Sequence, residues 1–379
     1  MIMLLWTALG CSSFVPGRKR RPPKHMSTTI TRDPQELKAR WETLRTEQPN
    51  LYLRNAAAEL GVSEAELLAT RVGDGVVFLN TDFKAILLDV CTLGYVMALT
   101  RNNDVVHERK GPYINPQLDG HVGLFLGADI DLRIFWGPWA YAFAVEEAGT
   151  DAVRKSLQFF GKDGHAIHKI YLTEQSNVAA YNELVAKHQA ADQAQVVTVQ
   201  PARAGRPEQP DSAIDVTGFQ AGWLALKDTH DFHMLVHGMG LTRTQALRMA
   251  PLGNWSVSVS PSALRATLTK AAADKVPIMI FVGNPGMIQI HSGEVVNVVD
   301  ARGWLNVLDP ELNVHIREEA ITQAWIVRKP TTDGLVTALE CYDAKGDQLI
   351  QLFGKRKPGI PELESWRELV QHVEEGCKV

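Results

Sequence analysis

The sequence predicts an α+β protein built as a tandem structural repeat, in which each half is a large antiparallel β-sheet with helices packed on it. Two observations lead to this class. The chain matches itself at a spacing of about 182 residues. In each half, helical patterns come first and are followed by a run of strands separated by turns rich in Asn, Asp and Gly. Helices grouped ahead of antiparallel strands indicate α+β rather than an alternating order of strand and helix.

The strand part of the repeat consists of two pairs of matching segments. Residues 96–107 (VMALTRNNDVVH) align with residues 278–289 (IMIFVGNPGMIQ), and each segment has two apolar stretches around an Asn-containing turn. At the same offset, residues 158–171 align with residues 340–353, and Gly164 matches Gly346 in the turn. All four segments are therefore predicted to be β-hairpins.

The helical part of the repeat lies just before the strands. Residues 60–70 resemble residues 239–249 at an offset of 179. An N-cap hydroxyl followed three residues later by Glu or Gln is the pattern of a capping box. The two predicted boxes pair Ser63 with Glu66 and Thr242 with Gln245. Further upstream, a helix is expected from Asp33-Pro34 to Thr46, with its counterpart at residues 221–236.

The expected domain organisation has four segments. They are an N-terminal extension (1–32), a first repeat (33–189), a linker rich in Pro, Gln and Ala (190–212) and a second repeat (213–379). In the extension a short apolar stretch precedes a basic run, which is the reverse of an export signal, and the stretch is too short to span a membrane. Lipoprotein processing at Cys11 is the less favoured alternative. We expect residues 1–32 to be disordered or to come from an over-extended start.

Composition excludes several function classes. The 379 residues are 45% hydrophobic and 22% charged, as in a globular protein, and a net charge of -4 argues against a nucleic-acid partner. Four widely spaced cysteines form neither a zinc ribbon nor a dithiol motif, and we expect them to be reduced thiols in the cytoplasm. The chain has no G-x-G-x-x-G turn and no P-loop, so dinucleotide and nucleotide binding are unsupported.

Three histidines stand out as candidate metal ligands. His230, His233 and His237 are separated by three and four residues, which places them on one face of a helix. A solvated helix surface is one interpretation. Zinc is a second, although the H-E-x-x-H pattern and a nearby cysteine ligand are both missing. An axial ligand to haem iron is the third, and the apolar neighbours Phe232 and Met234 would suit a porphyrin face.

Haem also carries two propionates, which bind to guanidinium or ammonium groups. Candidate donors are Arg243 after the histidine segment, Lys329 in V-R-K-P and Arg356 in F-G-K-R-K. Each of these alone is more often a solvated surface charge. The three residues form a binding site only if the fold brings them together.

Several phrases of the sequence resemble the hemin-degrading factor family, a group of bacterial cytoplasmic haem-trafficking and haem-degrading proteins. The resemblance extends from about Leu37 to Trp366. The phrases that carry it are LTRN with VHE, DLRIFW (131–136), DTHDF (228–232), LTRTQA (241–246), GWLN (303–306), AWIVRKPTTDG (324–334) and QLFGKR (351–356).

The resemblance implies a role for individual residues. It implies that His230 is the axial ligand, with His233 and His237 as alternates, and that Arg133 and Phe135 lie on the distal side, where Arg133 would be catalytic in an enzyme. It also implies that Arg243, Lys329 and Arg356 hold the propionates, that Phe281 lines the pocket, and that His107 marks a possible second haem site. Many members have tyrosine where this chain has Phe353, so one hydroxyl is missing.

The resemblance also implies the function. The favoured hypothesis is a cytoplasmic protein that receives imported haem and delivers it to a haem oxygenase, with the inner-membrane haem importer as a further expected partner. The alternative is an enzyme that degrades haem and releases iron. The position in the first repeat that matches His230 holds Pro49. We therefore expect the second repeat to supply the ligand and the propionate donors, and the first to act as a lid that contributes Arg133.

Overall fold

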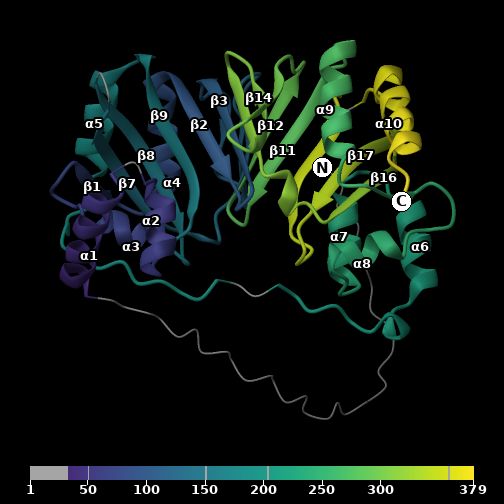
Figure 1. Cartoon of the computed structure of the whole chain (residues 1–379), viewed down its shortest axis with the longest axis horizontal. Coiled ribbons are helices and arrows are strands. Elements are labelled where there is room, and N and C mark those ends of the chain that lie inside the picture. The colour runs from purple at the N-terminus through teal and green to yellow at the C-terminus, as the bar shows by residue number, and fades with distance from the viewer. Residues whose placement is uncertain (1–32, 50, 150–151, 203–204, 357–358) are drawn as a thin grey trace, which may run out of the picture.

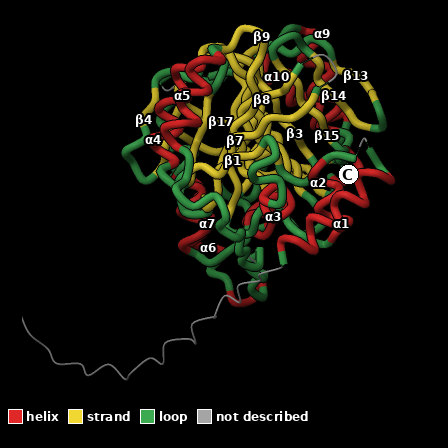
Figure 2. The backbone as a smooth tube through the Cα atoms, turned by 90° about the vertical axis from the view of Figure 1, so that its left-hand side faces the viewer, coloured by secondary structure: helices red, strands yellow, loops and turns green. Residues whose placement is uncertain are grey.

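The computed structural model describes residues 33–49, 51–149, 152–202, 205–356 and 359–379, so the predictions for residues 1–32 lie outside the described residues. The predicted fold class is confirmed. Two large antiparallel sheets lie beside each other along the long axis of the molecule, with helices packed against them (Figure 1). Seen from its N-terminal half, the molecule has helices on both sides of the strands (Figure 2).

The first sheet has the strand order β1-β7-β8-β9-β2-β3-β15-β14-β13. Its strands are β1 (Val76–Leu79), β2 (Gly94–Arg101), β3 (Val105–Pro112), β7 (Trp139–Ala148), β8 (Val153–Gly161), β9 (Ala166–Ser176), β13 (Val298–Ala301), β14 (Trp304–Leu308) and β15 (Leu312–Ile316).

The second sheet has the strand order β10-β16-β17-β18-β11-β12-β6-β5-β4. Its strands are β4 (Pro116–Gln117), β5 (Val122–Leu126), β6 (Asp131–Phe135), β10 (Ser256–Val259), β11 (Ile278–Asn284), β12 (Met287–Gly293), β16 (Gln323–Thr331), β17 (Gly334–Tyr342) and β18 (Gln348–Gly354).

The two halves of the chain exchange strands. Strands β4–β6 of the first half extend the second sheet through the pairing of β6 with β12, and β13–β15 of the second half extend the first sheet through the pairing of β15 with β3. Asn102 and Asn284, which are 182 residues apart, reinforce the exchange. The side-chain amide of each donates two hydrogen bonds to backbone carbonyls of the other half. Each sheet is therefore built from both halves.

The helices divide between the two halves. The first half holds α1 (Pro34–Glu47), α2 (Leu53–Leu60), α3 (Glu64–Ala69), α4 (Phe83–Val90) and α5 (Val178–His188). The second holds α6 (Val216–Leu224), α7 (Asp231–Gly238), α8 (Arg243–Arg248), α9 (Ala263–Asp274) and α10 (Glu364–Gly376). Helices α9 and α10 cover one face of the second sheet through a core that includes Leu268 and Trp366. Helices α6–α8 pack on the other face around Phe219, Trp223 and Phe232.

Most of the predicted repeat elements are present. All four predicted hairpins form, and the turn glycines Gly164 and Gly346 have φ angles of 74° and 81°, a left-handed conformation that favours glycine. The capping box of Ser63 is complete. The one predicted at Thr242 is only half formed, because the Gln245 amide donates instead to the carbonyl of Gln209 and the carboxylate of Asp211.

One predicted helix is wrong. The expected helix over residues 221–236 is broken between α6 and α7, because two aspartates bond to the backbone in its middle. Asp231 accepts hydrogen bonds from the amides of Lys227 and Asp228, and Asp228 accepts one from the amide of His230. Such local bonds compete with the helical ladder. His230 consequently occupies the N-cap position of α7 rather than the helix interior.

Candidate functional site

The site begins with the exposed ring of His230, at the N-terminus of α7. The side chain is 91% exposed, and its Nδ1 lies 2.5 Å from Oδ1 of Asp228. The same oxygen accepts the backbone amide of His230 at 2.8 Å, and this bond is the leading cause of the lowered pKa of Asp228. A carboxylate that receives Nδ1–H leaves Nε2 with its lone pair, which is the usual arrangement of a metal-binding histidine.

His233 and His237 lie one turn apart on α7, with ring centroids 6.3 Å apart. Both are exposed. Burial of part of the ring lowers the pKa of His233, and the nearby charges of Arg243 and His237 act in the same direction. His233 therefore favours the neutral form that a metal ligand requires.

Two of the three predicted propionate donors meet at one buried carboxylate, Glu340 of β17. Arg243, the first residue of α8, donates from Nε at 2.9 Å and from Nη2 at 2.7 Å, and Lys329 of β16 donates from Nζ at 2.8 Å. Gln351 and the hydroxyl of Tyr342 also donate to this carboxylate. The fold thus brings Arg243 and Lys329 together, around an acid that the sequence did not predict.

The charges in this cluster stabilise one another. Burial would raise the pKa of Glu340, but Arg243 and Lys329 outweigh it and hold that pKa far below its usual value. Burial, with a smaller contribution from Arg243, lowers the pKa of Lys329 to about 8, although Glu340 opposes the change. The ring of Phe232 covers both cations, with Nζ of Lys329 4.6 Å and Cζ of Arg243 5.3 Å from its centroid. Lys329 is only 3% exposed, whereas Arg243 is 26% exposed.

Arg356 lies on the His230 side of the same region. Its guanidinium is 3.5 Å from the carboxylate of Asp333 and contributes to the low pKa of Asp228. The structure therefore places all three predicted propionate donors near α7: Arg243 near His233, Lys329 beneath Phe232, and Arg356 near the carboxylate that orients His230.

Arg133 reaches this face through the strand exchange. It lies on β6 opposite Ile288 of β12, so it belongs to the second sheet itself and is not part of a lid. It forms an ion pair with Asp131 and is 29% exposed. Phe135, two residues further along β6, points to the same face because side chains alternate along a strand.

An apolar strip separates Arg133 from the Glu340 cluster. Cross-strand partners share a face, and Asp131, Ile290, Phe281, Gln351 and Glu340 are successive partners across five strands. Phe281 packs edge-to-face on Phe353, with centroids 5.0 Å apart. From Asp131 to Gln351 is three strand spacings, about 14 Å. The face thus offers an apolar strip with a cation near each end.

His107 lies elsewhere. It is on β3, 0% exposed, and burial lowers its pKa to about 3, with His291 as the next cause. Neither ring nitrogen has a hydrogen-bond partner among the described residues. The amide of Gln289 from the second sheet donates to the backbone carbonyl of His107. A haem at His107 would require the packed sheets to separate.

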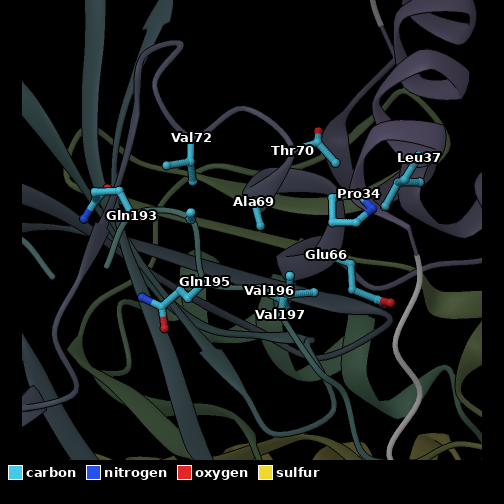
Figure 3. A pocket seen from close by; sticks show the side chains of 11 residues that line it. Pro34, Leu37, Glu66, Ala69, Thr70, Val72, Gln193, Gln195, Val196 and Val197 are labelled. Carbon is cyan, nitrogen blue, oxygen red and sulfur yellow. The ribbon is translucent and has the colours of Figure 1, made fainter. Parts of the chain in front are cut away.

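A separate hollow lies in the first half, where α1 and α3 meet the predicted linker (Figure 3). Its volume of about 170 Å³ is below the roughly 300 Å³ typical of small-molecule pockets. Leu37, Ala69, Val72, Val196 and Val197 are among the residues that line it. This hollow contains none of the predicted site residues.

The sequence left two important site residues without a role, Asp228 and Glu340. Asp228 stands two residues before His230, a spacing that lets its carboxylate reach the ring. Glu340 interrupts the apolar stretch of β17, and an acid in a buried strand is rare unless it is paired. The matching residue of the first repeat is the neutral Gln158, so a comparison of the two repeats would also have singled out the charge of Glu340.

The two halves of the chain match one and the same family of domains. Residues 61–188 and 240–373 each match the haemin-degrading HemS.ChuX domain, and the chain belongs to this family. Among curated proteins, it is 40% identical over 334 residues to the hemin transport protein HmuS of Yersinia pestis, which covers 87% of this chain and 94% of that protein. It is 39% identical over 333 residues to the hemin transport protein HemS of Yersinia enterocolitica, with the same coverage of both chains.

Solved structures give the same assignment. Holo-PhuS, a heme-binding protein from Pseudomonas aeruginosa, is 46% identical with a TM-score of 0.86, and the match covers 90% of this chain and 99% of PhuS. The heme-degrading enzyme ChuS of Escherichia coli O157:H7 is 35% identical with a TM-score of 0.83 at the same coverage. Within the described residues, no helix is both long and apolar enough to cross a membrane.

Proposed function

We propose that this protein binds one haem on the α7 face of the second sheet and carries it, in the cytoplasm, from an inner-membrane importer to a haem oxygenase. The relatives' own names support the ligand, because two are hemin transport proteins and one is a heme-binding protein. In this proposal His230 is the axial ligand, and His233 and His237 are its alternates one and two turns away.

The shape and charge of the face fit haem. The flat apolar ring of haem would lie against the strip of Phe281, Phe353 and Ile290, and its two propionates would meet the cations that flank this strip. Arg243 and Arg356 are the proposed propionate contacts, and Lys329 supplies positive charge from beneath Phe232. Arg133, with Phe135 beside it, lies at the far end of the strip and is the proposed distal residue.

The exposure of His230 is the observation that favours a carrier. Its ring is 91% exposed, so the proposed iron-binding nitrogen stands at an open edge of the protein. An open edge allows exchange with a partner, whereas catalytic sites usually exclude water from the reacting centre. The alternative, a haem-degrading enzyme, has its own support, since one neighbour at 34% identity is described as a heme oxygenase.

Haem titration of the purified protein tests the binding proposal. We expect a Soret band that saturates at one haem per chain, and a shifted band with weakened affinity in His230→Ala. Binding that is unchanged in His230→Ala, with His233 and His237 intact, would contradict the assignment of the ligand.

A second measurement separates the carrier from the enzyme. The haem complex is reduced under oxygen with catalase present, and biliverdin-like absorbance is followed. A carrier gives little of this absorbance and forms a complex with a haem oxygenase, which size-exclusion chromatography detects. Sustained ring opening with catalase present supports the enzyme instead.

A further inference from the structure

Glu340 is the centre of the proposed propionate site, and its hydrogen-bonding capacity is fully used. Oε1 accepts hydrogen bonds from Arg243, Lys329 and Gln351, at 2.7, 2.8 and 2.7 Å. Oε2 accepts from Nε of Arg243 at 2.9 Å, from the hydroxyl of Tyr342 and, at 3.5 Å, from the amide of Gln348. A buried carboxylate with six hydrogen bonds is held firmly in place.

This arrangement fixes how the guanidinium of Arg243 is presented. Its Nε and Nη2 are bound to Glu340, while the side chain remains 26% exposed. The inner edge is therefore occupied, and the outer edge, with Nη1, is left for an incoming carboxylate. An arginine held in this way loses little freedom on binding a ligand.

The charges of the cluster leave one positive charge over. Two cations, Arg243 and Lys329, surround one carboxylate, and the other side chains bonded to that carboxylate are neutral: Tyr342, Gln348 and Gln351. Across the cluster, Phe232 of α7 contributes an uncharged ring, and His233 lies within electrostatic reach of Arg243. Glu340 thus cancels one of two positive charges that would otherwise both attract a propionate.

The first repeat shows that the fold accepts glutamine at this position. At the repeat offset, Glu340 corresponds to Gln158, which is buried in β8 and whose amide donates to Ser156. The residue that matches Arg243 is Glu64, which pairs with Lys169 and Arg101. The same framework therefore places the negative charge on the helix in one half and on the strand in the other.

We propose that Glu340 is a positioning residue that sets the strength of haem binding: it orients Arg243 and cancels one positive charge, so that the site holds a propionate reversibly. This inference rests on the proposed function. A protein that passes its ligand on needs such a limit on affinity, because an uncompensated pair of cations would hold the dianion more tightly.

A charge series tests the proposal. The wild-type cluster has one excess positive charge. Glu340→Gln raises this excess to two, Lys329→Met lowers it to zero, and the double variant restores it to one. The probes are haem and haem dimethyl ester, which has the same ring but no free carboxylates. Dissociation constants are measured at low and at moderate ionic strength, and circular dichroism checks folding.

We expect Glu340→Gln to bind haem more tightly than wild type and Lys329→Met to bind it most weakly. The double variant should have an affinity close to that of wild type. Each single step should be at least about tenfold, or 1.4 kcal/mol, and should shrink with added salt. Affinity for the dimethyl ester should stay within about twofold throughout. A residue that only stabilised the fold would change both ligands together.

Other outcomes overturn the proposal. Weaker haem binding by both Glu340→Gln and the double variant means that Glu340 acts through orientation alone. A change of equal size for haem and its ester means a structural role. If Glu340→Gln does not fold, the double variant is compared with Lys329→Met, from which it differs only in the charge at residue 340, and equal haem affinities refute the proposal. If the wild type binds neither porphyrin, the proposed function fails and this inference fails with it.

Discussion

Acidification should destabilise the protein through three buried histidines, well before its carboxylates are protonated. Burial lowers the pKa of His107 and His168 to about 3 and of His291 to about 4. The unfolded chain binds a proton at each of these sites near pH 6.5, and the folded chain does not. Stability that is present above pH 6.5 is therefore lost as the pH falls toward the folded pKa values.

The size of the effect follows from these values. Between pH 7.5 and 5.5, each such histidine lowers the free energy of unfolding by about 1.4 kcal/mol, and the three together by about 4 kcal/mol. Replacing His107 with leucine removes one of the titrating groups. The loss of stability over this range should then be about 1.4 kcal/mol smaller than in wild type.

Urea denaturation at pH 7.5, 6.5 and 5.5, followed by tryptophan fluorescence and far-UV circular dichroism, measures this difference. His372→Gln, at an exposed position on α10, is the matched control and should behave as wild type. The same pH dependence in His107→Leu and wild type would refute the reasoning, because it would mean that a proton reaches His107 in the folded state.

Three further predictions concern single side chains. Asp228→Asn should weaken haem binding by about 10- to 100-fold, because the ring of His230 loses its carboxylate partner, while Asp82→Asn, at the N-cap of α4, should leave the Soret titration unchanged. Asn284→Ala should lower the free energy of unfolding by about 1–3 kcal/mol, since two carbonyls of the first half lose their donor; an unchanged urea midpoint would contradict this. Ser63→Ala should lower the melting temperature by removing a capping box worth about 1 kcal/mol, and an unaltered melting curve would argue against it.

The sequence was sufficient for the repeat, its hairpins and the fold class, because apolar periodicity and turn glycines are local signals. It did not predict the strand exchange. Strand β6 pairs with β12 of the other half, and the same apolar pattern would serve pairing with β3 of its own half. Which of these two strands pairs with β6 depends on the whole fold. Because β6 pairs with β12, Arg133 lies on a strand of the second sheet and not in the expected lid.

The site residues were predicted as types of side chain, but their interactions were not. Arg243 and Lys329 were predicted to be propionate donors, and in the structure both already form ion pairs with Glu340. The single helix expected at 221–236 does not form, because Asp228 and Asp231 make short-range hydrogen bonds to the backbone. These bonds leave His230 exposed at an N-cap. Ion pairs and side chain–backbone bonds depend on exact placement, which periodicity does not encode.

The exchanged strands have a consequence for how the two halves diverge. In a dimer of identical chains, strands traded in this way would create two equal sites, and every substitution would appear in both. Joining the units in one chain removes that constraint. The helix residue is Arg243 in one half and Glu64 in the other, and the matching strand residue is Glu340 in one and Gln158 in the other. One half can therefore acquire substitutions that suit its own site, while the other half keeps residues that stabilise the shared fold.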